Sequence, residues 1–365
     1  MRPPRASASL PLATVLAGLL TLAACVGAPG PPGGDAAAGA PRVLRQPPDR
    51  ALTVALVTEA DVPAAFALGP GGRLFVGELT TGRILVDGRV VADLTVSAGD
   101  ESGLESLAVG PGGDWLLAYA SLGAGPDDGG EAVTTQVLRF DLDAEGRPGP
   151  PRPILELPGT GTHNAGSVAV GPDGLVYVDV GDNIRRGAAA DLSSPFGKIL
   201  RLTPDGAPAP GNPFADRAGA DPRVWAWGIR NSFALTWAAD GRLLAADNGP
   251  EAGDELNVVE AGANYGWPPE DQPPDARPPR FTWPETFAPA GLAIVPEGFG
   301  AWSGGGRVLA CGVVAQRMDL VDLDDPAAGA EPVVDGCALH VVAEGPGSVL
   351  FSDARAVWRL SAEAR

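Results

Sequence analysis

The hydrophobic positions of this chain fall in short runs, and a Gly-rich turn precedes many of them. The clearest case is the Gly-Pro-Asp-Gly turn at 171–174, followed by the apolar run from Leu175 to Val178. Five similar segments lie at residues 69–76, 110–117, 239–244, 304–309 and 345–351. Gly and Pro supply the backbone angles of tight turns, and short apolar runs between turns favour buried strands. We therefore expect an all-β chain, and no segment shows a convincing amphipathic helix.

The six copies of this turn-and-strand unit predict a radial repeat. They are spaced about 40 to 70 residues apart, which is room for four antiparallel strands in each unit. One such unit cannot bury both of its faces alone, so the units must pack around an axis. This predicts a six-bladed β-propeller with four-stranded antiparallel blades. A β-sandwich is the alternative, but it leaves the recurrence unexplained. In a propeller the long loops gather at the rim of the central channel, where we expect a site.

The N-terminal segment has the pattern of an export signal. Arg2 and Arg5 precede a short apolar stretch from Leu10 to Ala24, which is too short for a stable membrane-spanning helix. The stretch ends in Leu-Ala-Ala-Cys, which resembles a bacterial lipobox, so we expect a signal peptide over 1–24 and lipidation of Cys25. An ordinary signal peptide with an incidental cysteine is the alternative. This predicts an exported, membrane-anchored lipoprotein, periplasmic or on the cell surface.

The residues that follow Cys25 are rich in Gly, Ala and Pro and lack large apolar groups up to about residue 42. Such a segment cannot bury a core. We expect a flexible tether over 25–45 and the propeller over 46–365.

Composition narrows the range of partners. The chain has 365 residues, and its 26 Lys and Arg against 45 Asp and Glu give a formal charge of −19. Such a field repels phosphate backbones and attracts cations, so a nucleic-acid partner is excluded from our expectations. Besides Cys25 the chain holds Cys311 and Cys337. Export permits a disulfide between them, but two unpaired thiols remain equally compatible with the sequence.

Two segments carry candidate chemistry. His163, one of two histidines, lies in a loop of small residues, where an imidazole could move a proton near neutral pH. A hydrogen-bonded structural role is the alternative. The segment 245–257 is crowded with carboxylates and loop carbonyls, the oxygen ligands that Ca²⁺ prefers. A solvated acidic loop is the alternative reading of that segment.

Several motifs in order resemble the glucose/sorbosone dehydrogenase family. They are His163-Asn164-Ala165-Gly166, the turn at 171–174, Gly181-Asp182, the segments 197–202, 211–214 and 228–231, Asn248-Gly249-Pro250 through Asp254-Glu255, and Asn264-Tyr265-Gly266-Trp267-Pro268. The resemblance runs from about residue 50 to the C-terminus and is strongest over 160–270. It implies a six-bladed propeller that uses pyrroloquinoline quinone (PQQ) and Ca²⁺ to oxidise aldose sugars.

The resemblance also implies roles for individual residues. His163 would be the general base, Arg230 would polarise the quinone carbonyl, and Asn231 and Glu101 would contact the cofactor. The remaining implied positions are metal sites: the backbone carbonyls of Gly249 and Pro250 for the cofactor-side Ca²⁺, and Glu255, Tyr265 and Asp254 for a second, structural Ca²⁺.

The chain departs from the family pattern where positive charge is expected. The family has a late-blade lysine, whereas the sole lysine here is Lys198, in mid-chain. The family's Arg-x-Arg segment falls at Ala338-Leu339-His340, and its usual glutamine falls at Glu101. The arginine expected after the histidine motif is Ser167, and Arg317 is a candidate replacement cation.

Three functions are compatible with these residues. The first is PQQ- and Ca²⁺-dependent oxidation of an aldose to its lactone, with electrons passed to a membrane or periplasmic acceptor. The second is a non-catalytic propeller that binds sugar or protein. The third is a Ca²⁺-dependent lactonase using a metal-bound water. The retained His163, Arg230 and Gly249-Pro250 favour the first.

Overall fold

The computed structural model describes residues 40–99, 101–123, 133–159, 161–164, 166–271 and 273–364. The expected signal peptide and the expected lipidation site Cys25 lie outside these residues. Residues 40–364 belong to one compact unit. Within it, no helix of the described residues has the length and apolar character needed to cross a bilayer.

The described chain forms six four-stranded antiparallel sheets, which confirms the predicted fold. The first three blades follow one another along the chain. Their strands are β2 (Ala65–Leu68), β3 (Leu74–Gly77), β4 (Arg83–Val86) and β5 (Arg89–Asp93); β6 (Leu104–Val109), β7 (Trp115–Leu122), β8 (Thr134–Asp141) and β9 (Arg152–Pro158); and β10 (Gly166–Val170), β11 (Val176–Val180), β12 (Lys198–Leu202) and β13 (Val224–Trp227).

The next two blades repeat this order, and the sixth closes the ring. Their strands are β14 (Ser232–Trp237), β15 (Leu243–Asp247), β16 (Glu255–Val259) and β17 (Phe281–Thr282); β18 (Pro289–Ile294), β19 (Arg307–Gly312), β20 (Arg317–Asp322) and β21 (Ala330–Asp335); and β22 (Val341–Gly345), β23 (Ser348–Ser352), β24 (Ala356–Ala364) and β1 (Arg50–Glu59). The described helices are short: α2 (Arg186–Ala190) and 3₁₀ turns at Pro70–Gly72, Pro269–Asp271, Gly300–Trp302 and Pro326–Ala328.

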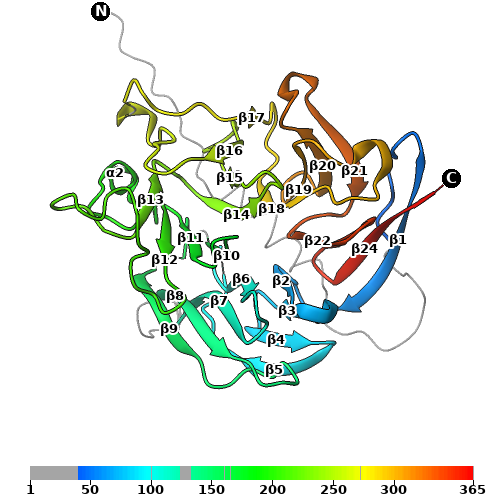
Figure 1. Ribbon diagram of the computed structural model, residues 1–365, viewed down its shortest axis with the longest axis horizontal. Coiled ribbons are helices and arrows are strands. Elements are labelled where there is room, and N and C mark those ends of the chain that lie inside the picture. Colours follow the sequence, from blue (N-terminus) through cyan, green and yellow to red (C-terminus); the bar gives the residue numbers. More distant parts are fainter. Residues whose placement is uncertain are drawn as a thin grey trace, which may run out of the picture. The chain divides into compact units, whose positions relative to one another are not determined.

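The blades surround a central axis, with the first strand of each nearest the centre (Figure 1). Because successive strands are antiparallel, the first-to-second turns all lie on one face of the ring. The second-to-third loops and the connections between blades lie on the other, which we call the site face. All six Gly-rich segments found in the sequence fall at first-to-second turns, between β2 and β3 through to β22 and β23. The repeat therefore marks the face opposite the site.

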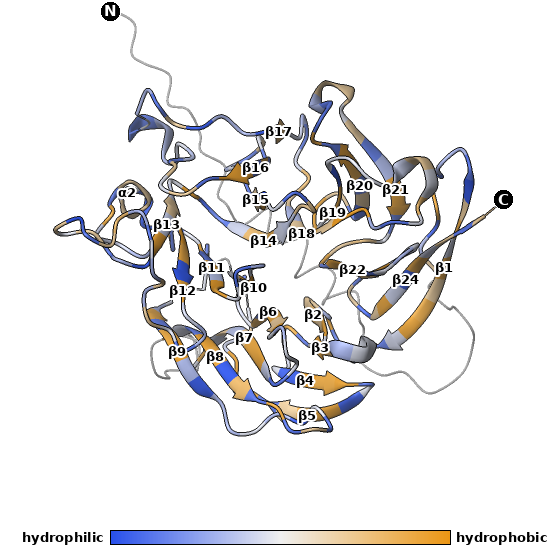
Figure 2. Ribbon diagram, in the orientation of Figure 1, coloured by the Kyte–Doolittle hydropathy of each residue, from blue (hydrophilic) through white to orange (hydrophobic). Residues whose placement is uncertain are grey.

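Six hydrophobic clusters hold the blades together, one at each interface between neighbours. Figure 2 shows the apolar residues concentrated in the strands. The cluster between blades six and one, around Phe66 and Leu350, is the smallest. A cavity of about 340 Å³ lies at the same interface and is bordered by the Glu344–Arg359 ion pair. The closing interface is thus less completely packed than the others.

Blade six is built from both ends of the described chain. β1 pairs antiparallel with β24 from Arg50↔Ala364 to Glu59↔Ala356. The last residues of the expected tether are also held to the propeller, because Val43 bridges Val334 and the backbone N–H of Leu44 donates to the carbonyl of Val333. Ordered pairing therefore starts a few residues earlier than residue 46.

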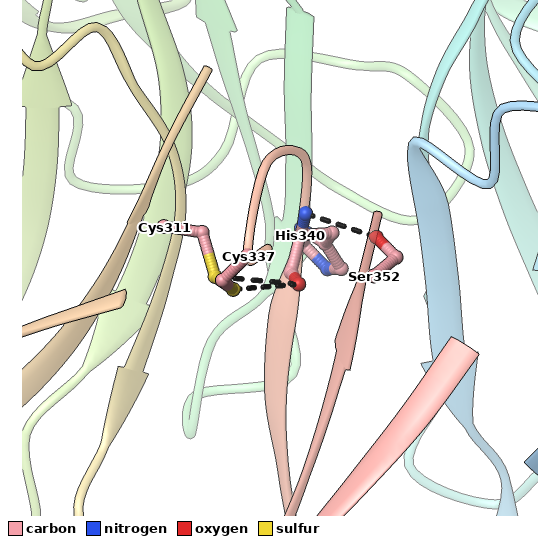
Figure 3. The surroundings of a disulfide bond; sticks show 4 residues. All are labelled: Cys311, Cys337, His340 and Ser352. Carbon is pink, nitrogen blue, oxygen red and sulfur yellow. Dashed lines mark hydrogen bonds between the residues drawn. A yellow bond between two sulfur atoms is a disulfide. The ribbon is translucent and has the colours of Figure 1, made fainter. Parts of the chain in front are cut away.

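Cys311 and Cys337 form a disulfide, which the sequence alone left open. It ties the end of β19 to the connection between blades five and six (Figure 3). Both cysteines are fully buried. The two sulfurs lie 3.6 and 4.0 Å from the carbonyl oxygen of His340. The backbone N–H of His340 donates to Ser352 Oγ at 3.2 Å. The disulfide thus fixes the start of the segment Ala338-Leu339-His340.

Candidate functional site

The predicted site residues come from loops of the site face in blades two to four. Glu101 precedes β6, His163 precedes β10, and Arg230 with Asn231 connects β13 to β14. Gly249 lies in the loop after β15. Antiparallel alternation brings these loops to one side of the ring, although they are far apart in sequence.

His163 is held against Asp182, which lies just beyond the end of β11. The Nδ1 atom of His163 is 2.7 Å from Oδ1 of Asp182. His163 is 8% exposed and has a φ of 51°, a left-handed conformation that a β-carbon disfavours. When Nδ1 carries the proton and donates it to this carboxylate, Nε2 is the basic nitrogen. In this arrangement Nε2 of His163 could accept a proton.

Asp182 is fully buried and accepts three hydrogen bonds. Besides His163, the backbone N–H of Ile184 donates at 2.9 Å and the indole Nε1–H of Trp267 at 2.8 Å. Burial alone would raise the pKa of Asp182, but the hydrogen bonds from His163, Trp267 and Ile184 outweigh it and hold the pKa below its ordinary value. The carboxylate therefore stays ionised beside the imidazole.

Glu101 joins the base to the neighbouring blade connection. Its Oε2 accepts from the backbone N–H of His163 at 2.7 Å and from Nδ2 of Asn231 at 3.0 Å. The structure thus brings Glu101, His163 and Asn231 together, as the sequence predicted. A carboxylate here adds negative charge where the family pattern has a neutral amide.

Arg230 is the buried cation of the site. It is 8% exposed, and its guanidinium donates from Nη1 to the carbonyl of Asn248 at 2.8 Å and lies 5.4 Å from the centre of the Trp267 ring. Its Nε is buried without a hydrogen-bond partner among the described residues, and so is Oδ1 of Asn231. Orphaned buried polar atoms are costly, so both point to a ligand or ordered water at this place.

A cavity of about 290 Å³ opens beside Arg230. Its lining includes Gly249, Pro250, Asp247, Glu255, Tyr265 and Trp267. Gly249 is required there, because a β-carbon would come within 2.4 Å of the carbonyl oxygen of Ala252. The cavity therefore gathers four of the predicted metal positions next to the predicted catalytic arginine.

Two carboxylates of this cavity face each other across neighbouring strands, Asp247 on β15 and Glu255 on β16. Burial raises the pKa of Asp247 to about 6, against hydrogen bonds from the backbone N–H groups of Arg230 and Asn231. Burial and the Asp247 carboxylate raise the pKa of Glu255 to about 7. A bound cation would relieve this desolvated pair.

Asp254 occupies a different position from the other predicted metal ligands. Its Oδ1 accepts from the backbone N–H of Gly249 at 2.9 Å, and its Oδ2 accepts from those of Phe287 and Ala288 at 2.7 and 2.8 Å. Both oxygens are thus engaged, and Asp254 shapes the Gly249 loop instead of facing the cavity. No group of three or more acidic, His or Cys side chains in the described chain forms a ready metal site.

Arg317 and Lys198 both have partners within the described chain. Nε of Arg317 donates a hydrogen bond to Oδ1 of Asp319 at 2.7 Å. Lys198 is fully buried, and its Nζ donates to the carbonyls of Ala188, Ala189 and Phe196 at 2.8 to 2.9 Å. Its role is structural.

Three contributors had no role in the sequence-based prediction: Asp182, Asp247 and Trp267. Asp182 and Trp267 stand inside motifs that carried the resemblance, and that was the available signal. Their contacts join positions 19 and 85 residues apart, and no spacing rule predicts such pairs.

Comparison with known proteins shows which family this chain resembles. The glucose/sorbosone dehydrogenase family model matches residues 60–354. The aldose sugar dehydrogenase YliI of Escherichia coli K12 is 37% identical over 112 residues, which is 30% of either chain. The chain matches about half or less of the length of its first curated relatives.

Two solved structures share the fold over their whole length. A candidate oxidoreductase (glucose dehydrogenase) from Thermus thermophilus is 32% identical, with a TM-score of 0.73, and covers 85% of this chain and 100% of its own. The PQQ-bound form of aldose sugar dehydrogenase from Streptomyces coelicolor is 27% identical, with a TM-score of 0.71, and covers 87% and 100%. Since the family model spans most of the sequence, the chain belongs to the glucose/sorbosone dehydrogenase family.

Proposed function

We propose that this protein oxidises an aldose sugar at its anomeric carbon to the lactone, using PQQ and Ca²⁺, and passes the electrons to an external acceptor. The observation that carries the proposal is the pairing of the His163–Asp182 dyad with a buried Arg230 whose Nε has no partner among the described residues. A base and a buried cation with an unused donor are what removal of hydrogen from a sugar hydroxyl carbon uses.

In this proposal His163 accepts the proton of the anomeric hydroxyl on Nε2. Asp182 holds the imidazole in place and stabilises the positive charge that the imidazole gains. When bound, PQQ supplies the two-electron acceptor for the hydrogen on the anomeric carbon. Arg230 is placed to stabilise negative charge that develops in the site.

The residues present fit the carbonyl end of this cofactor and its Ca²⁺. The orphaned Arg230 Nε and Asn231 Oδ1 offer a donor and an acceptor, and Asp247 and Glu255 would be stabilised by a cation. Gly249 and Pro250 line the same cavity. With the late arginines replaced, more of the charge on the three PQQ carboxylates is left for Ca²⁺ to balance. We therefore expect PQQ binding to depend strongly on Ca²⁺.

Reconstitution tests the proposal. Purified protein is titrated with PQQ in the presence of Ca²⁺ or of a chelator, and a panel of aldoses is then assayed by dye reduction. We expect binding and turnover only with Ca²⁺. Sugar binding without PQQ binding or turnover, with an active control enzyme, would instead identify a binding propeller. Ca²⁺-dependent lactone hydrolysis without PQQ would identify a lactonase.

We also propose that the protein is exported and anchored through a lipid on Cys25, so that the site works near a membrane acceptor. The Leu-Ala-Ala-Cys sequence supports this. Labelling cells with a fatty-acid analogue should mark the wild-type protein and leave Cys25→Ala unmarked; labelling of both would refute it.

A further inference from the structure

Trp267 contacts three parts of the candidate site: the carboxylate of Asp182, the guanidinium group of Arg230 and the cavity. Its indole Nε1–H donates to Oδ2 of Asp182 at 2.8 Å. The guanidinium carbons of Arg186 and Arg230 lie 4.5 and 5.4 Å from the centre of its ring. The ring also lines the cavity beside Gly249 and Glu255.

The backbone around Trp267 is fixed to the loop that carries Arg230. Asn264 bridges Trp227, and the backbone N–H of Trp267 donates to the carbonyl of Gly228 at 3.0 Å. Gly228 has a φ of 74°, and a β-carbon there would lie 2.0 Å from Oδ1 of Asn264. The long segment between β16 and β17 is therefore brought back to the site face and locked there. The indole has little freedom to leave Asp182.

The two oxygens of Asp182 have separate tasks. Oδ1 meets Nδ1 of His163 and the backbone N–H of Ile184, whereas Oδ2 receives the indole of Trp267. A carboxylate held at only one oxygen can rotate about its last bond and lose the geometry that selects the imidazole tautomer. In free histidine the neutral ring prefers its proton on Nε2, so the Nδ1–H form has to be imposed.

We propose that Trp267 is a positioning residue for the base: its indole N–H fixes Asp182, which keeps neutral His163 in the Nδ1–H form with Nε2 directed to substrate. Because the same ring packs against Arg230, Trp267 couples the orientation of the base to that of the buried cation. The catalytic consequence rests on the proposed function, whereas the tautomer does not.

The test compares two tryptophan variants in the cofactor-free protein. Trp267→Phe removes the N–H and keeps an aromatic ring over the arginines. Trp225→Phe is the matched control, because Trp225 also has a guanidinium over its ring, that of Arg201 at 4.7 Å, while its Nε1 has no hydrogen-bond partner among the described residues. The chain has only two histidines, so ¹⁵N spectra of the imidazoles resolve His163 directly.

With the His163 ring in its neutral form, we expect the Nδ1–H tautomer in wild type and in Trp225→Phe. We expect a substantial shift toward the Nε2–H tautomer in Trp267→Phe. An unchanged tautomer in a folded Trp267→Phe variant would overturn the proposal.

A second measurement needs no variant at position 267. In wild type the indole N–H proton of Trp267 should resonate downfield of that of Trp225, because only the former donates to a carboxylate. Equal shifts would contradict the proposed bond.

Kinetics with the reconstituted enzyme separate this role from the proposed function. Trp267→Phe should lower kcat by about tenfold with KM changed less than about threefold, and Trp225→Phe should match wild type. Absence of turnover in wild type would remove the proposed function, while the tautomer would still decide the positioning role. Equal kcat in Trp267→Phe and wild type would overturn the catalytic part.

Discussion

His163 and His340 carry the same imidazole in opposite surroundings. His163 faces an ionised carboxylate at the site. His340 packs edge-on against Phe66, with ring centres 4.7 Å apart, and burial lowers its pKa to about 4 against the carbonyls of Phe66 and Ala290. The first imidazole is held by a carboxylate, whereas the second stays neutral until strongly acidic conditions.

Replacing the base should separate catalysis from folding. His163→Ala is expected to abolish turnover, because it removes the imidazole that is proposed to take the proton. The thermal midpoint in Ca²⁺ should stay close to that of wild type, since His163 lies in a loop. Dye reduction and calorimetry measure the two effects. Persistent turnover would make His163 a structural residue.

His340 should make the protein sensitive to acid. Its folded pKa of about 4 lies below the unfolded value of 6.5, so the unfolded chain binds more protons between these values. The free energy of unfolding therefore rises with pH across this window and is lost on acidification. Because part of the residue stays accessible to solvent, we expect His340→Gln to remove about 1–3 kcal/mol of this dependence.

Denaturant unfolding of wild type and His340→Gln at pH 4 to 7 measures the difference. Parallel pH profiles for the two proteins would contradict the role given to His340.

Sequence reasoning at this scale found the residues that stand in motifs. As expected, Glu101, His163 and Asn231 lie together, and Arg230, Gly249 and Glu255 line one cavity. The sequence could not show that Asp254 uses both oxygens on backbone N–H groups. A carboxylate looks the same in sequence whether it binds a metal or shapes a loop.

At the scale of the elements, Lys198 fastens the start of β12 to the segment around α2. Its ammonium group uses three donors on three carbonyls, although burial lowers its pKa to about 7. The loop so fixed follows Asp182 and carries Arg186. The sole lysine thus stabilises a segment that follows a residue of the site.

Lys198→Met should destabilise the protein, because it leaves three buried carbonyls without their donor. We expect a loss of about 3 kcal/mol, from several hydrogen bonds to a charged group. Lys198→Arg keeps the charge but not the compact geometry, and should recover only part of it. Denaturant melts measure both, and a neutral effect of Lys198→Met would show that water replaces the ammonium group.

Turn chemistry predicted the elements well, because Gly-rich segments mark the same turn in every blade. The two-residue strand β17 and the long segment before it gave no such signal. Their course is decided by contacts with blade three, such as the bridge between Trp227 and Asn264. Tertiary contacts of this kind are invisible to local patterns.

At the scale of the whole molecule, the Cys311–Cys337 disulfide joins blade five to its connection with blade six, at the site face. Its loop of 26 residues constrains the unfolded chain. Cys311→Ala with Cys337→Ala should lower the free energy of unfolding by about 2–4 kcal/mol. Calorimetry of the oxidised and doubly substituted proteins compares them. Unchanged stability would show that the cross-link does not act through the unfolded state.

The number of blades followed from counting turns, but how the ring closes did not. The pairing of β1 with β24 joins residues about 300 positions apart, and the sequence of neither strand indicates its partner. Only the assembled sheet shows that the sixth blade takes its outer strand from the beginning of the domain.

The pairing of β1 with β24 limits when the ring can close during synthesis of the chain. Blade six stays incomplete until residues 356–364 have been made and can meet residues 50–59. If the protein is exported as proposed, passage through a translocon as an open polypeptide requires that this pairing forms only afterwards. A lipid at Cys25 would keep β1 near the bilayer until β24 is available to pair with it.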